Sequence, residues 1–181
     1  MLTHQQVVDN LVAVTERVGA AAERAGRDPD AVTLVVVTKT RSLAEVETVV
    51  EAGARDLGEN YIQELVDKAE YFGDAQVRWH AIGHLQRNKV RHVAPVVSLL
   101  HSLDSMKLAR EVDKRAQAAG REIKALLQVN VAGEDTKFGV DEDGALELAP
   151  QVAELEHVRL AGLMTMPPFV DDAEDNRPHF A

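Results

Sequence analysis

The chain contains no cysteine among its 181 residues, which excludes disulfide bonds, thiolate nucleophiles and cysteine-ligated metals. Acidic residues outnumber basic ones by 30 to 20, and the formal net charge of -10 opposes the electrostatic attraction that drives sequence-independent nucleic-acid binding. No apolar run approaches the roughly 18 residues that cross a bilayer, and the N-terminus lacks the pattern of a signal peptide. We therefore expect a cytoplasmic protein without nucleic-acid or membrane partners, folded as one domain over residues 1–181.

Hydrophobic periodicity predicts strands that alternate with helices. Residues 32–38 are almost continuously apolar and β-branched, which is typical of a parallel strand covered on both faces. Ser42 and Glu45 then match a capping box, and Gly53 suits the left-handed position that ends a helix. The other predicted strands are residues 54–57, 77–82, 96–101, 123–131 and 158–164. The other predicted helices are residues 5–25, 60–72 and 104–119, a short one before Pro95, one through Leu146, Val152 and Leu155 that kinks or restarts near Pro150, and one from near Asp172.

This alternation predicts an all-parallel α/β fold, either an open doubly wound sheet or a barrel. The sequence has no Gly-x-Gly-x-x-Gly loop of the kind that open nucleotide-binding sheets carry after their first strand. Polar residues instead follow every strand, and strand ends that converge on one site are typical of a barrel. Because a complete barrel seldom has fewer than about 200 residues, we expect an incomplete TIM-type (β/α) barrel with about six of eight strand–helix units.

Polar motifs at the strand ends occur in a characteristic order. They are residues 35–40 (VVVTKT), 57–64 (LGENYIQE), 79–89 (WHAIGHLQRNK), 101–105 (HSLDS), 128–131 (QVNV) with 135–139 (DTKFG), and 162–166 (GLMTM). Together they resemble the pyridoxal-phosphate homeostasis family, whose PLP-binding barrel is similar to the N-terminal domain of alanine racemases. The family's Ser-Met-Gly-Met-Ser-type and Arg-x-Gly-type turns, which hold the cofactor phosphate, are absent from these residues. The resemblance therefore implies a PLP-binding barrel domain that is truncated at its C-terminus.

Lys39 is the residue that the resemblance implies as the cofactor-holding lysine. A lysine amine attacks an aldehyde only as the free base, so its site has to disfavour the charged form by desolvation or through a neighbouring cation. Arg41 lies two positions further on and could supply that cation. Position alone leaves open an ordinary solvated lysine in a β–α loop. With the resemblance, we expect pyridoxal 5′-phosphate (PLP) to be held as an imine on Lys39.

The resemblance implies further cofactor contacts from Asn60, His84, Asn130, Lys137 and Met164. For three of these residues the sequence also allows a simpler role. Asn60 suits a helix N-cap, Lys137 suits a solvated charged loop, and Met164 suits a core position.

Histidines also follow two of the predicted strands. His80 and His84 are four residues apart, but Gly83 between them indicates a strand end rather than a helix face. Neutral, hydrogen-bonded histidines are therefore favoured over a metal site formed with His101, and we expect no bound metal.

A racemase needs a second acid or base across the substrate from its lysine, usually a tyrosine from a further domain. Tyr61 and Tyr71 are the only tyrosines and fall in one predicted helix. We therefore expect a non-enzymatic carrier or buffer in PLP homeostasis, a monomer or weak dimer, with PLP as ligand and PLP-dependent apoenzymes as candidate recipients. Two alternatives stay open. One is a Schiff-base enzyme, racemase-like or class I aldolase-like with Glu59 as acid or base, and the other is a cofactor-independent regulatory module that borohydride and PLP would not label.

Overall fold

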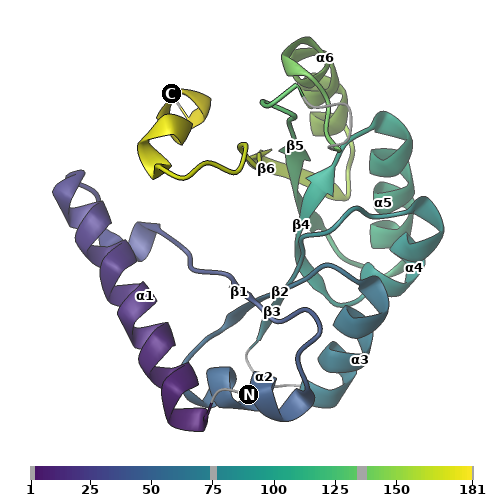
Figure 1. Ribbon diagram of the computed structural model, residues 1–181. Helices are drawn as coiled ribbons and strands as arrows, with labels where there is room; N and C mark the ends of the chain where they lie inside the picture. The colour runs from purple at the N-terminus through teal and green to yellow at the C-terminus, as the bar shows by residue number, and fades with distance from the viewer. Residues whose placement is uncertain (1–2, 74–76, 134–137, 181) are drawn as a thin grey trace. The chain divides into compact units, whose positions relative to one another are not determined.

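The computed structural model describes residues 3–73, 77–133 and 138–180. Strands and helices alternate along the chain, as Figure 1 shows. The helices are α1 (His4–Arg24), η1 (Pro29–Ala31), α2 (Leu43–Glu51), α3 (Ile62–Phe72), η2 (Arg87–Lys89), α4 (Val90–Val93), α5 (Met106–Ala118), α6 (Glu142–Ala153) and η3 (Ala173–Phe180), where η denotes a 3-10 helix. The strands are β1 (Val36–Val37), β2 (Asp56–Glu59), β3 (Arg78–Ala81), β4 (Val97–Leu103), β5 (Ile123–Gln128) and β6 (Val158–Met164).

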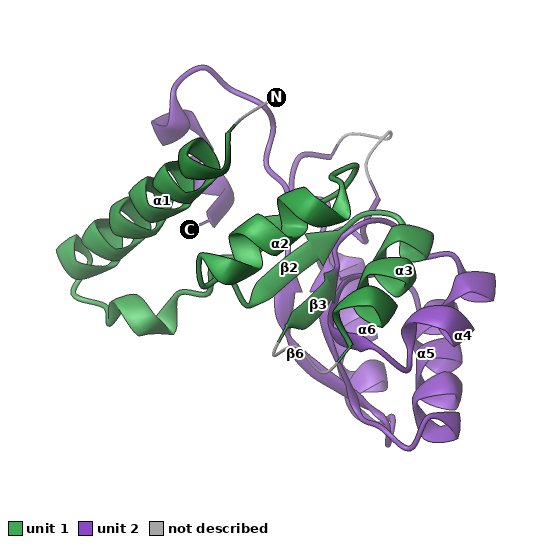
Figure 2. Cartoon of the chain, turned by 90° about the horizontal axis from the view of Figure 1, so that it is seen from below, with its two compact units in different colours: residues 1–80 green, residues 81–181 purple. Residues whose placement is uncertain are grey.

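The chain divides into two compact units, residues 1–80 and residues 81–181 (Figure 2). The order of neighbouring strands, β1-β2-β3-β4-β5-β6, is the same as their order along the chain. In the first unit β1 pairs with β2 in parallel, with Val36 opposite Leu57. In the second unit β5 pairs in parallel with both β4 and β6, with Ile123 opposite Val158. These pairings agree with the parallel α/β class that the sequence predicts.

The first unit is built around β2, all four of whose residues are buried. The predicted capping box begins α2, because Ser42 accepts a hydrogen bond from Glu45 N while the Glu45 side chain accepts one from Ser42 N. Gly53 follows that helix with φ +104°, in the left-handed region that favours glycine. Leu57 of β2 and Leu65 of α3 are completely buried in this unit's core.

The second unit packs its helices α4, α5 and α6 on one side of β4, β5 and β6 (Figure 1). Ser105 caps α5 by accepting a hydrogen bond from Leu108 N. The buried face of α5 carries Leu108, Val112 and Ala116, spaced four residues apart, so one helical stripe supplies the core contacts. This arrangement places the ends of three parallel strands at one edge of the unit.

The first predicted strand differs most from the observed elements. The strand predicted for residues 32–38 forms only over Val36–Val37, and Val37 is 47% exposed rather than covered on both faces. Since β1 stands at one end of the strand order, its hydrogen-bonded strand neighbour among the described residues is β2 alone. The helix predicted to kink or restart near Pro150 does not restart there: α6 is continuous through the proline, with Leu148 and Val152 buried on either side. The helical stretch predicted from near Asp172 is present as the 3-10 helix η3. Within the part of the chain that the structure describes, no helix is long and apolar enough to cross a membrane.

Candidate cofactor site

The turn after β1 carries Lys39. β1 ends at Val37, and the N–H of Thr38 donates a hydrogen bond to Gly58 O of β2 at 3.0 Å. Thr38 is buried, whereas Lys39 is exposed and its amine makes no hydrogen bond or ion pair with the described residues. Thr40 then adopts φ +60°, a left-handed conformation that is strained for a β-branched residue. The chain thus leaves the sheet through a strained turn that presents Lys39 to solvent.

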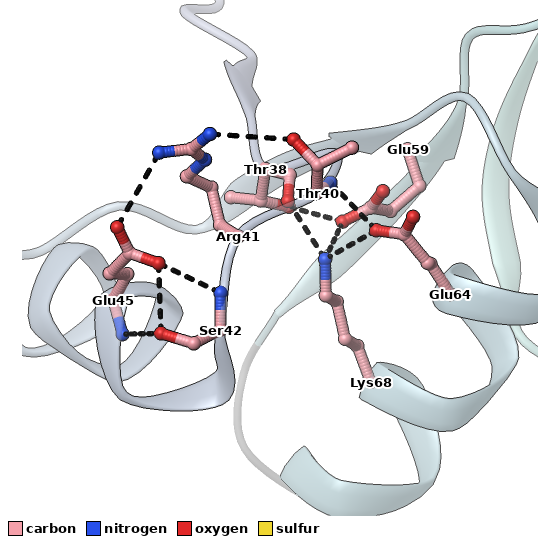
Figure 3. A network of polar contacts seen from close by, with 8 residues as sticks. All are labelled: Thr38, Thr40, Arg41, Ser42, Glu45, Glu59, Glu64 and Lys68. Carbon is pink, nitrogen blue, oxygen red and sulfur yellow. Dashed lines mark hydrogen bonds and ion pairs between the residues drawn. The ribbon is translucent and has the colours of Figure 1, made fainter.

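A buried ion pair supports the residue before Lys39 (Figure 3). Lys68 Nζ of α3 donates to Thr38 O at 2.8 Å and to Glu59 Oε1 of β2 at 2.6 Å. The Thr38 hydroxyl donates to the same Glu59 oxygen at 2.6 Å. Glu59 is 0% exposed and Lys68 is 5% exposed, so these contacts are shielded from water. Both the backbone and the side chain of Thr38 are therefore fixed to β2 and α3.

The residue after Lys39 is held through the same lysine. Thr40 N–H donates to Glu64 Oε2 of α3 at 2.8 Å, and that oxygen lies 3.1 Å from Lys68 Nζ. The hydrogen bond from Thr40 N–H, helped by Lys68, lowers the pKa of the Glu64 carboxyl group below its usual value against a smaller opposing effect of burial. Figure 3 shows dashed contacts from the Lys68 nitrogen to both Glu59 and Glu64. Lys68 thus links the supports on both sides of Lys39.

Arg41, expected as a cation close to Lys39, is engaged by a carboxylate. Its Nη1 lies 3.5 Å from Glu45 Oε1, and its Nη2 donates a long hydrogen bond of 3.4 Å to the Thr40 hydroxyl. Backbone and side-chain hydrogen bonds from Ser42 lower the pKa of Glu45, so this partner keeps its negative charge. Arg41 therefore contributes a paired charge to the turn.

Asn60 belongs to the same unit, directly after β2. It is half-buried, and its side chain makes no hydrogen bond with the described residues. The N-cap of α3 is Tyr61, without a side-chain capping bond, so the alternative that Asn60 caps this helix is wrong. The helix begins one residue later than a cap at Asn60 would require. This leaves the Asn60 amide available to a ligand.

His84 lies in the second unit, after β3. Its ring stacks on that of Phe138, with centroids 4.0 Å apart and planes inclined by 11°. Its Nδ1 lies 3.4 Å from Asp104 Oδ2. The segment following β5 is thus brought onto the loop following β3 by an aromatic contact.

In the second unit, Asn130 follows β5, and Met164 is the last residue of β6. Val129 N–H donates to Met164 O at 2.9 Å, and Asn130 N–H donates to Val140 O at 2.8 Å. Both predicted residues are half-buried. A Cβ on Gly139, which has φ +120°, would lie 2.9 Å from Asn130 N, so only glycine fits there without displacement. The residue before Asn130 is therefore paired with Met164 at the ends of the two strands.

Lys137, the remaining predicted contact, lies outside the described residues. Of the others, Lys39 and Asn60 belong to the first unit, and His84, Asn130 and Met164 to the second. Lys39, Asn60 and Asn130 follow the carboxyl ends of the parallel strands β1, β2 and β5, and Met164 ends the parallel strand β6, as the sequence predicts.

His80, which the sequence groups with a less favoured metal site, has a carboxylate partner instead. Its Nε2 lies 3.0 Å from Asp56 Oδ1, and Arg78 donates two hydrogen bonds to the same carboxylate. Burial lowers the pKa of His80 despite this partner. The described part of the chain contains no group of three or more side chains suited to holding a metal ion.

An apolar cavity of about 410 Å³ also lies in the first unit, between α1, β1 and α2. Its walls include Leu11, Leu34 and Val36, with Arg41 and Glu45 among its polar members, but Lys39 does not line it. The cavity therefore borders the lysine turn through Thr38 and Arg41, although the Lys39 side chain is not part of its wall.

Sequence reasoning missed Lys68 and the role of Glu64. The signal available was their spacing of four residues on one predicted helix, which places an acid and a base on the same face. That spacing is common on solvated helices, and nothing local indicates that this pair is bound to a turn more than twenty residues earlier.

These observations define a parallel α/β protein with a lysine turn after its first strand and polar residues after later strands. A family model described as "Alanine racemase, N-terminal domain" matches residues 10–181. A pyridoxal phosphate homeostasis protein of Aquifex aeolicus (strain VF5) is 40% identical over 172 residues, which are 95% of this chain and 75% of that protein. The chain therefore belongs to the pyridoxal phosphate homeostasis protein family, within the wider group of alanine racemase N-terminal domains.

Solved structures agree with this assignment. PipY of Synechococcus elongatus PCC7942 with PLP bound has a TM-score of 0.76 at 32% identity, over 92% of this chain and 76% of that one. An alanine racemase from Bartonella henselae has a TM-score of 0.70 at 14% identity, over 97% of this chain and 47% of that one, which shows the shared fold alone. The predicted fold class, the α/β barrel type of alanine racemase N-terminal domains, is confirmed.

Proposed function

We propose that this chain binds pyridoxal 5′-phosphate through Lys39 and acts as a non-enzymatic carrier or buffer in PLP homeostasis. The observation that carries the proposal is the position of Lys39, exposed and without a protein partner among the described residues, on a turn whose two neighbours are fixed. An amine in that setting can add to the aldehyde carbon of PLP, and loss of water then leaves a carbon–nitrogen double bond. The PLP-bound relative and the relatives named for PLP homeostasis support this role.

The other predicted contacts belong to the proposal as well. Asn60, which is half-buried, lies in the first unit with Lys39, and in the second unit His84 and Asn130 follow strands while Met164 ends β6. Lys137 is proposed as a second amine able to capture or pass on the aldehyde. PLP-dependent apoenzymes are the proposed recipients, a cytoplasmic setting is proposed for the transfer, and the chain is proposed to act as a monomer or weak dimer.

A catalytic role for Glu59 is less well supported than this carrier role. An acid or base in a Schiff-base enzyme has to reach the substrate, whereas Glu59 Oε1 is occupied by both the Thr38 hydroxyl and Lys68. Among curated relatives, those named pyridoxal phosphate homeostasis protein match at 33–40% identity.

Hydride trapping tests the proposal. The intact protein is incubated with PLP, reduced with borohydride and weighed by mass spectrometry, and the modified peptide is sequenced. We expect one reduced adduct on Lys39 and a yellow imine absorbance before reduction, with both lost in Lys39→Ala. Lys107→Ala, which removes an exposed lysine of α5, is the matched control and should leave the signal unchanged. Undiminished absorbance and adduct in Lys39→Ala would refute the assignment.

A further inference from the structure

The residues on either side of Lys39 are held by three side chains from the next strand and helix. Thr38 is bound through its carbonyl by Lys68 and through its hydroxyl by Glu59. Thr40 is bound through its N–H by Glu64. Lys39 itself takes no part in these contacts, so they fix its backbone and leave its amine accessible.

We infer that Glu59, Glu64 and Lys68 are positioning residues for Lys39. These three side chains form a clamp that keeps the Lys39 turn in the conformation in which its amine reacts. The inference rests on the proposed function for the role of Lys39 as the reacting amine. Its structural half, the control of the turn, stands on the contacts alone.

Thr40 shows why a clamp is needed. Its φ of +60° is the only positive value recorded for a non-glycine residue in the described chain, and left-handed backbone is unfavourable for a β-branched side chain. Such strain persists only where surrounding contacts over-determine the conformation. The Glu64 carboxylate, which accepts the Thr40 N–H at 2.8 Å, is the contact that does so from outside the turn.

Lys68 gives the clamp its rigidity. A buried ammonium group that meets a carbonyl oxygen and two carboxylates within 3.1 Å has its three donors directed at three acceptors. Its position therefore fixes Glu59 relative to Glu64, and with them the residues before and after Lys39. Charge-assisted hydrogen bonds of this kind are short and strong, so the turn has little freedom to relax.

The clamp also gives a role to the buried carboxylate of Glu59. Glu59 is completely buried with one oxygen, Oε2, lacking a hydrogen-bond partner among the described residues, which is costly unless the other oxygen is well satisfied. Its Oε1 meets that need with two bonds of 2.6 Å. Because a buried ion pair adds little net stability compared with apolar packing, its contacts to Thr38 agree with a role in orienting the backbone beside Lys39.

The first experiment measures the turn without cofactor. Hydrogen exchange of the Thr40 amide is followed in the wild type, Glu64→Ala and Glu64→Gln, with Glu70→Ala as control because Glu70 is an exposed glutamate on the same helix. We expect exchange at Thr40 at least tenfold faster in Glu64→Ala, a smaller change in Glu64→Gln, which keeps an acceptor oxygen, and no change in Glu70→Ala. Unchanged protection of Thr40 in Glu64→Ala would overturn the clamp whether or not PLP binds.

The second experiment measures reactivity. The same variants are titrated with PLP, and the rate of borohydride-trapped adduct formation on Lys39 is compared. We expect roughly a tenfold loss in Glu64→Ala and substantial recovery when Thr40→Gly is added, because glycine adopts the left-handed conformation without outside help. A merely structural role for Glu64 would not be repaired at Thr40, so absence of recovery would count against the inference. If the wild type formed no adduct on Lys39, the proposed function would fail and the positioning role with it, while the exchange result would still decide whether the clamp holds the turn.

Discussion

Glu59 of β2 and Lys68 of α3 form a buried ion pair, with 2.6 Å between Glu59 Oε1 and Lys68 Nζ. Neither charge is in contact with bulk water, so each depends on the other and on the Thr38 groups that join them. The pair links the turn between β1 and α2 to strand β2 and helix α3. Its removal therefore affects both the stability of the first unit and the turn that carries Lys39.

Replacing Lys68 by methionine should strongly destabilise the protein. The change leaves the Glu59 carboxylate buried without its cation, and breaking a buried pair in this way costs about 3–5 kcal/mol. Urea unfolding followed by circular dichroism measures the loss. Lys107→Met on the exposed face of α5 should stay within about 0.5 kcal/mol of the wild type. Adding Glu59→Gln to Lys68→Met should recover part of the loss, and equal stabilities for Lys68→Met and Lys107→Met would contradict the burial of this pair.

Thr40→Gly should stabilise the folded chain, although glycine usually destabilises. Relief of a left-handed threonine is worth about 1–2 kcal/mol, and the greater freedom of glycine in the unfolded chain takes back about 0.5–1 kcal/mol. The expected net gain in the free energy of unfolding is therefore between about 0 and 1.5 kcal/mol. Thr33→Gly, at an exposed threonine without a positive φ, should lower stability instead. A loss at Thr40 as large as that at Thr33 would show that the turn is not strained.

Local features of the fold could be predicted from the sequence, whereas contacts between distant residues could not. The Ser42–Glu45 capping box, Gly53 after α2 and the strand at Val158–Met164 all follow from local pattern, and the structure has them where the sequence places them. The clamp was not predicted, because Lys68 reaches Thr38 across thirty residues and only the folded chain brings them together. The short β1 was overestimated for a similar reason, since its apolar residues suit a strand but its extent depends on its partners.

Acidification should destabilise the chain through His80. Burial lowers the pKa of His80 in the folded state, whereas in the unfolded chain it titrates near 6.5, so the unfolded chain takes up a proton first as the pH falls. The stability contributed by neutral His80 is complete above about pH 6.5 and is lost as the pH falls from there through the lowered pKa of the folded state. His80→Gln should make the free energy of unfolding less dependent on pH below about pH 6.5. His92→Gln, at an exposed histidine, is the control, and an unchanged slope in His80→Gln would contradict the assignment.

A second acid-sensitive window belongs to Asp56, the partner of His80. Burial alone would raise its pKa, but hydrogen bonds from Arg78 and His80 outweigh burial and lower it. The stability that this carboxylate contributes is therefore present above its unfolded pKa of about 3.9 and is lost as the pH falls through the lower folded value. Asp56→Asn should weaken the pH dependence below about pH 4, separately from the His80 window. Unfolding curves at closely spaced pH values distinguish the two.

Gly139→Ala should disturb Asn130 more than an equivalent change elsewhere in the same connection. A Cβ at Gly139 would lie 2.9 Å from Asn130 N and 3.0 Å from Gln128 O, both backbone atoms that cannot move aside easily. Gly133→Ala meets nothing within 4 Å, and its φ of +63° costs alanine about 1–2 kcal/mol, so this variant shows the cost of left-handed backbone without a steric clash. We expect Gly139→Ala to lose more stability than Gly133→Ala and to trap less PLP. Equal losses in the two variants would mean that the backbone adjusts without cost.

Because Thr40 depends on a carboxylate from α3, labelling of Lys39 by an aldehyde should serve as a chemical reporter of folding in the first eighty residues. Partial unfolding that detaches α3 would release the turn and alter the labelling rate before the whole chain opens. The labelling rate of this one side chain would then report, in a mixture and without spectroscopy, whether β2 and α3 are folded.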